Sequence, residues 1–150
     1  MTADGAKAVG GGRPGAPLAL RGLVAAALLV DVVVHLRLAG GYQQSAPGGI
    51  GAGTLFRIES ATAFAVAAWV LWRGSRTFLL AAFAVGLSAL VAVVLYRYVN
   101  VPAVGPLPAM YEPVWFATKT LSAVAEAVAA GAAALGLRQL RQRASTPDLH

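Results

Sequence analysis

An apolar run from Leu18 to Ala39 is the feature that most constrains how this chain can fold. An α-helix needs roughly 20 apolar residues to cross a bilayer, so the run predicts a membrane-spanning helix. It nevertheless contains Asp31 and His35, whose spacing of four positions places an acid and an imidazole on one helix face. An unpaired charge near the middle of a bilayer costs ~2.5–3.5 kcal/mol, so this face must turn toward protein or trapped water. The sequence therefore predicts further helices that cover it.

The composition indicates a small polytopic membrane protein. Of the 150 residues, 58% are hydrophobic and 12% are charged, which is far from the balance of a soluble domain. The length allows one domain of about four spans with short connections. We therefore predict an all-α fold, a four-helix transmembrane bundle with spans at about residues 18–39, 55–72, 77–99 and 114–137. The chain has no cysteine, which excludes disulfides, thiolate metal sites and cysteine nucleophiles.

The segments outside these spans have the composition of tails and loops. Residues 1–17 are rich in Gly and Ala without hydrophobic periodicity, so we expect a disordered tail. Glycines and a proline indicate a loop at residues 40–54. Four of the eight prolines lie in residues 101–113, which predicts a semi-rigid cap rather than regular helix or sheet. Residues 138–150 are expected to form a basic tail.

Basic residues concentrate at one set of helix ends. Eight of the twelve lie in or near the tails and in the turn at residues 73–76. The positive-inside rule then predicts cytoplasmic N and C termini in a multi-pass protein of the plasma membrane, with the lipid bilayer as its surroundings. The net charge of +6 does not indicate nucleic-acid binding, because the basic residues are not interleaved with aromatic side chains on one soluble face.

The predicted spans place five ionisable side chains in the outer half of the bundle. They are Asp31, His35, Glu59, Lys119 and Glu126. At 1.5 Å per residue, His35 lies roughly 6 Å and Asp31 roughly 12 Å below the outer boundary. Small residues share the helix faces that carry these groups, so neighbouring backbones can approach closely around them. We predict a polar pocket here, with secondary members near the same outer end of the helices. These are Tyr96, Tyr111 and Glu112.

Several interpretations of this pocket are open. In a structural role, Lys119 or an arginine would neutralise Asp31 or Glu126, and His35 would bond to a carboxylate. In a metal site, Asp31 and His35 would project together, and Glu59 or Glu126 would complete an O/N shell suited to Zn, Mn or Fe. In a third interpretation, the acid and imidazole bind or relay a small solute, a proton or a lipid-like molecule such as a quinone.

Enzyme chemistry within the membrane is a fourth interpretation. No nucleophile and base stand out as a pair, because the serines of the spans lie in apolar contexts where hydroxyls usually bond the preceding turn or another helix. Bis-histidine haem ligation within one chain is not available, because His35 is the only histidine in a predicted span and His150 ends the chain.

Short motifs add a resemblance to a known group. They are His35-Leu36, Tyr42, Ile50-Gly51, Leu55-Phe56, Glu112-Pro113 and Lys119. Their order resembles a group of small, uncharacterised four-span membrane proteins of high-GC actinobacteria. In size and shape the chain is also loosely similar to the DoxX-like membrane proteins. The resemblance covers about residues 20–137 and implies a four-helix membrane bundle. It brings no activity, ligand or catalytic residue.

From these observations we predict a non-enzymatic membrane protein, either an accessory subunit or a small-solute binder. A membrane-protein partner or a second copy of the chain would fit the first role. No cofactor is expected. The alternative is a metal- or quinone-dependent membrane enzyme, and any metal would be bound by residues of the polar pocket. Those residues are Asp31, His35, Glu59 and Glu126.

Overall fold

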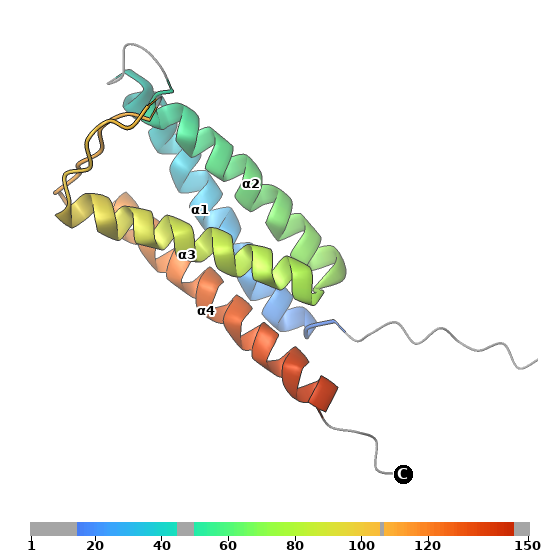
Figure 1. Cartoon of the computed structure of the whole chain (residues 1–150). Coiled ribbons are helices and arrows are strands. Elements are labelled where there is room, and N and C mark those ends of the chain that lie inside the picture. The colour runs from blue at the N-terminus through green and yellow to red at the C-terminus, as the bar shows by residue number, and fades with distance from the viewer. Residues whose placement is uncertain (1–14, 45–49, 106, 146–150) are drawn as a thin grey trace, which may run out of the picture.

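The computed structural model describes residues 15–44, 50–105 and 107–145, and within them it contains four long α-helices (Figure 1). They are α1 (Leu18–Gln44), α2 (Ala52–Arg73), α3 (Arg76–Tyr98) and α4 (Ala117–Ser145). Each helix is long and apolar enough to cross a membrane. The prediction of an all-α bundle of four membrane-spanning helices is therefore confirmed, and the chain is a multi-pass membrane protein.

Helix α1 continues past its predicted end at residue 39. It runs through Gly40 and Gly41 to Gln44, although each glycine inside a helix costs about 1 kcal/mol relative to alanine. A tertiary contact stabilises this last turn, because the Tyr42 ring packs edge-on against Phe56 of α2 with the centroids 5.0 Å apart. Helix α2 likewise begins at Ala52, inside the loop predicted at residues 40–54, and residues 45–49 of that loop lie outside the described residues. So do residues 1–14 of the tail predicted at residues 1–17 and residues 146–150 of the tail predicted at residues 138–150.

The turn between α2 and α3 is built on Gly74. Its φ of 53° is in the left-handed region that glycine adopts without strain, and its N–H donates to the Val70 carbonyl at 2.9 Å. The Arg21 guanidinium of α1 donates to the same carbonyl oxygen at 2.9 Å. The start of α1 is thereby attached to the end of α2.

Helix α4 begins at Ala117, after Pro113, and extends beyond the predicted span end at residue 137 to Ser145. Its basic residues Arg138 and Arg141 are therefore helical rather than part of an extended tail. The buried face of α4 is mostly alanine, which allows α3 to approach closely. A Cβ on Gly86 of α3 would lie 2.9 Å from the Glu126 carbonyl oxygen.

The four helices pack around an apolar core. Helix α1 packs chiefly against α2 and α4, and α3 packs chiefly against α4. The largest wholly buried apolar side chains are Val24, Leu28, Val70 and Leu79. The outward faces of all four helices are also apolar, which is suitable for contact with lipid. The start of α1 and the end of α4 lie at the same end of the bundle (Figure 1).

The segment between α3 and α4 forms a hairpin at the other end. Isolated antiparallel bridges join Val101 to Met110 and Val104 to Leu107, with Gly105 at a φ of 57° in the turn. We call residues 99–116 the cap. It reaches from the ends of α3 and α4 toward the ends of α1 and α2 (Figure 1). It is neither helix nor regular sheet, as its prolines predicted.

Candidate functional site

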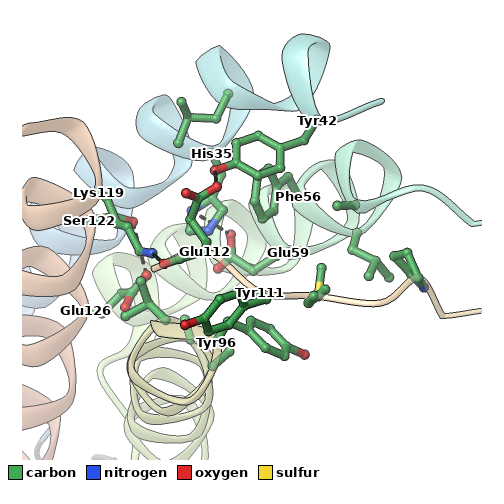
Figure 2. Close-up of a pocket in the computed structure, with 18 of the residues that line it drawn as sticks. His35, Tyr42, Phe56, Glu59, Tyr96, Tyr111, Glu112, Lys119, Ser122 and Glu126 are labelled. Atoms are coloured by element: carbon green, nitrogen blue, oxygen red, sulfur yellow. Dashed lines mark hydrogen bonds and ion pairs between the residues drawn. The ribbon is translucent and has the colours of Figure 1, made fainter. Parts of the chain in front are cut away.

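A cavity of about 490 Å³ lies under the cap, between the ends of the four helices. Every helix and the cap contribute to its wall, which is mainly apolar and aromatic. Aromatic members of the wall are Tyr42, Phe56, Tyr96, Tyr111 and Phe116. The polar members are concentrated on one side, as Figure 2 shows for His35, Glu59, Ser122 and Glu126. Because five segments of the chain form this wall, the cavity exists only in the folded protein.

Below the cavity lies an acid–imidazole cluster, which we define as Asp31, His35, Glu59, Ser122 and Glu126; all of these except the buried Asp31 line the cavity floor. Within it, His35 Nδ1 lies 3.0 Å from Asp31 Oδ1 and 3.3 Å from Glu59 Oε2. The spacing of four residues places Asp31 and His35 on consecutive turns of α1, and α2 supplies Glu59 from the side. The imidazole also packs edge-on against Phe56, with ring centroids 4.9 Å apart, which sets its orientation.

Ser122 connects the acids of two helices. Its Oγ lies 2.5 Å from Asp31 Oδ1 of α1 and 3.0 Å from Glu126 Oε1 of α4. The hydroxyl has a single proton, so it can donate to only one of the two carboxyl groups at a time. Ser122 therefore holds the two acids close together but can donate a hydrogen bond to only one of them.

Several carboxyl oxygens of the cluster have no hydrogen-bond partner among the described residues. They are both oxygens of Glu59 and Oε2 of Glu126. Asp31 and Glu126 are only 1% and 2% exposed. Buried polar atoms in proteins are almost always hydrogen-bonded, and an unmet carboxylate is costly. The floor of the cavity is therefore short of hydrogen-bond donors and positive charge.

Lys119 is buried but does not belong to the cluster. Its Nζ donates to the Glu112 carbonyl oxygen at 2.6 Å and lies 5.4 Å from the centre of the Trp115 ring. Within the described part of the chain, it forms no ion pair with a carboxylate of the cluster. Lys119 thus lines the same cavity, but its amino group does not pair with Asp31 or Glu126 in this structure. The lysine instead binds the cap, because the cap folds back over the start of α4.

The secondary residues predicted from the sequence lie around the cavity. Besides its carbonyl contact with Lys119 of α4, Glu112 attaches the cap to two more helices: its carboxylate accepts a hydrogen bond from Tyr42 Oη of α1 at 2.7 Å, and its N–H donates to the Tyr96 carbonyl of α3 at 2.9 Å. Tyr96 and Tyr111 line the wall nearby (Figure 2). Whether these residues and the cluster form a functional site stays a prediction.

We expect Tyr42→Phe to loosen the cap. The change removes the hydroxyl that donates to Glu112 and keeps the ring contact with Phe56. Hydrogen bonds to a charged group contribute about 1.5–3 kcal/mol, so amide exchange in residues 107–113 should accelerate by at least tenfold. Hydrogen–deuterium exchange by mass spectrometry measures this. Tyr98→Phe is the matched control, because Tyr98 is 70% exposed. In this variant, amide exchange in residues 107–113 should be unchanged. Equal exchange in both variants would contradict the role of the Tyr42–Glu112 bond.

Sequence reasoning missed three members of this site. Ser122 resembles any other helix serine in the sequence, and Tyr42 has the position of an interfacial aromatic residue. Phe56 was noted only in a short motif. The spacing of Ser122 four residues before Glu126 was the one available signal, because it puts both on one face of α4.

The fold and this cavity define a class: a small multi-pass membrane protein whose four helices and cap enclose a cavity with an acid–imidazole floor. No protein-family model, curated protein or solved structure matches the chain. The resemblance to four-span actinobacterial and DoxX-like proteins is therefore supported only as far as the four membrane-spanning helices.

Proposed function

We propose that this protein is a non-enzymatic solute-binding protein of the plasma membrane, and that the cavity under the cap holds the solute. The observation that carries the proposal is the cavity itself, whose floor contains buried carboxyl oxygens without partners. Its volume of about 490 Å³ is within the range of small-molecule sites in proteins. A bound solute would supply the donors or positive charge that the floor lacks.

The wall indicates what kind of solute would fit. Aromatic rings from α1, α2, α3 and the cap provide apolar contact, while His35, Glu59, Ser122 and Glu126 lie together at the floor. An amphipathic molecule satisfies both regions, with its hydrogen-bond donors at the acids and its apolar body against the rings. A purely apolar molecule would leave the acids unmet, and a purely polar one would be poorly matched to the wall.

The apolar core below the cluster favours a role in binding the solute over a role in passing it across the membrane. Toward the end of the bundle that holds residues 15 and 145, the buried side chains of the described residues are apolar. They include Leu28, Ala67, Val70 and Leu79. A charged solute or proton would have to cross this packed layer without a polar partner, at a cost of several kcal/mol. We therefore propose that solute enters and leaves through the cap end.

The distribution of basic residues supports an orientation for this cavity. Most of the basic residues that the structure describes lie at the bundle end formed by the start of α1 and the end of α4, which the positive-inside rule assigns to the cytoplasm. In this proposal the cap and the cavity face the outside of the cell.

Thiol labelling tests the proposal, because the natural chain has no cysteine. We expect Ala92→Cys, in the cavity wall on α3, to react with a membrane-impermeant, positively charged methanethiosulfonate added outside intact cells. Ala67→Cys is the control, because Ala67 is 1% exposed in the apolar core, and it should not react. Labelling of Ala92→Cys only from the cytoplasmic side would contradict the proposed orientation.

Protection from labelling tests solute binding. Small-molecule extract of the cells that produce the protein should slow the labelling of Ala92→Cys by at least tenfold, because a bound solute covers the same wall. The same extract should leave the labelling of a cysteine at exposed Val104 of the cap unchanged, which controls for reaction of the extract with the reagent. Equal labelling rates with and without extract would contradict a solute-binding role.

A further inference from the structure

We infer that Asp31, His35 and Glu59 of the acid–imidazole cluster bind a divalent transition-metal ion, with Glu126 of α4 joined to Asp31 through Ser122. The inference rests on the proposed function, because it assigns a metal ion to the floor of the same cavity. The ion, rather than the solute, would then supply the positive charge that the floor lacks, and the solute would meet a positive centre at the end of an apolar chamber.

The positions of the ligand atoms fit one metal ion. One carboxylate oxygen each of Asp31 and Glu59 and one ring nitrogen of His35 all lie within 4.8 Å of one another. His35 Nδ1 is 3.0 Å from Asp31 Oδ1 and 3.3 Å from Glu59 Oε2. Bonds of ~2.0–2.2 Å from a central ion place neighbouring ligand atoms at about these separations. The three side chains therefore need little movement to share an ion.

The unmet oxygens supply an independent observation. Glu126 is 2% exposed and lines the cavity, yet its Oε2 has no partner among the described residues. Glu59 Oε1 likewise has no hydrogen-bond partner there, and Glu59 Oε2 lies 3.3 Å from His35 Nδ1 without a hydrogen bond. A helix bundle that buries three carboxyl groups around a single imidazole lacks positive charge, and buried charges are normally paired or bound to metal. A dication supplies the missing charge and accepts the lone pairs directly.

The groups around the cluster would orient these ligands. Ser122 Oγ contacts Asp31 Oδ1 at 2.5 Å and Glu126 Oε1 at 3.0 Å, which would orient the Asp31 carboxyl group beside the ion. Ser60 Oγ donates to the Val32 carbonyl at 3.5 Å, which links α2 to α1 beside the ligands. Outer-shell bonds of this kind typically change metal affinity by about 10–100-fold.

The donor set narrows the choice of metal. One imidazole nitrogen with carboxylate oxygens and no sulfur suits Mn²⁺, Fe²⁺, Co²⁺ or Zn²⁺, and disfavours copper(I), which prefers thiolate and thioether ligands. Because the cavity lies above the cluster, a solute or water would have room to supply a remaining ligand. With Nδ1 on the metal, the His35 proton would lie on Nε2.

Metal binding to the full chain in detergent tests this inference. The protein is first treated with a chelator and then titrated with Co²⁺, whose binding is followed by visible absorption. Zn²⁺ binding is measured by its displacement of the bound Co²⁺. We expect one equivalent to bind, with the absorption bands of an N/O-ligated Co²⁺ ion. Glu59→Gln and His35→Ala should each weaken binding by at least tenfold. Glu112→Gln is the matched control, because it removes another cavity carboxylate outside the ligand set, and it should bind as the natural chain does.

The outcomes separate the metal site from the proposed solute binding. Absence of saturable Co²⁺ and Zn²⁺ binding to the folded natural chain would overturn the metal site, as would equal affinity in Glu59→Gln and Glu112→Gln. Circular dichroism establishes whether each variant is folded. If His35→Ala does not fold, the near-isosteric Glu59→Gln still tests the metal site. If the chain binds neither Co²⁺ nor Zn²⁺ and Ala92→Cys is still protected by extract, only the metal site is overturned. Stoichiometric metal without protection overturns solute binding and leaves the metal site standing.

Discussion

Asp31→Ala is expected to lower the free energy of unfolding in detergent by about 3 kcal/mol or more, because it removes the centre of the buried cluster. Asp31 is 1% exposed and contacts both His35 at 3.0 Å and Ser122 at 2.5 Å. Its loss would leave the imidazole and the hydroxyl inside the bundle without their shared acceptor. Unfolding by sodium dodecyl sulfate, followed by circular dichroism, measures the change.

Two further variants interpret the result for Asp31. Asp31→Asn keeps the shape of the side chain but not its charge. A loss of free energy of unfolding within about 1 kcal/mol would mean that Asp31 stabilises the fold mainly by hydrogen bonding. A loss of ~3 kcal/mol would mean that it does so mainly by ionic pairing with His35. Ser88→Ala is the control, because Ser88 is exposed on α3 and bonds only the preceding turn. A loss below about 1 kcal/mol for Asp31→Ala would contradict a stabilising role for the cluster.

Gly53→Val is expected to have the second large effect, by separating α1 from α2. A Cβ at position 53 would lie 2.2 Å from the Ala39 carbonyl oxygen and 2.9 Å from the Gln43 backbone nitrogen. These are backbone atoms that cannot move aside as a side chain does. Overpacking typically costs about 1–3 kcal/mol, and we expect at least this loss for Gly53→Ala and a larger one for valine.

The same substitution should also disturb the cavity, because the first turns of α2 carry Leu55 and Phe56 into its wall. We expect the protection of Ala92→Cys by extract to fall together with stability. Gly131→Ala is the matched control, since no atom lies within 4 Å of a Cβ there. It should leave stability unchanged or raise it by up to about 1 kcal/mol through helix propensity. Equal effects at both glycines would contradict a close α1–α2 contact.

Much of the helical framework could be predicted because its cause is local. A run of apolar residues specifies a membrane-spanning helix through its own length, so four runs predict four helices without knowledge of how they pack. Helix ends were less predictable. Gly40 and Gly41 indicated a loop, yet α1 continues through them, because Tyr42 packs on Phe56 and bonds to Glu112 across the fold.

The partners of the buried polar groups were only partly predictable. The spacing of Asp31 and His35 is a property of one helix, so their contact could be expected from sequence. The position of Lys119 could not, because it depends on how the cap folds over α4 and presents the Glu112 carbonyl. The bridging position of Ser122 depends in the same way on how α4 is rotated against α1.

The sequence by itself determined that this chain spans a membrane four times and that the acids and imidazole of its spans must avoid lipid, since hydropathy and helical periodicity act within each segment. Only the tertiary structure decided which of these groups meet. It places Glu59 and Glu126 with the Asp31–His35 pair and leaves a cavity above them (Figure 2). It also directs the Lys119 amino group to the Glu112 carbonyl of the cap. The physical reason is that such contacts depend on helix rotation and on the path of the cap, which packing between distant segments sets.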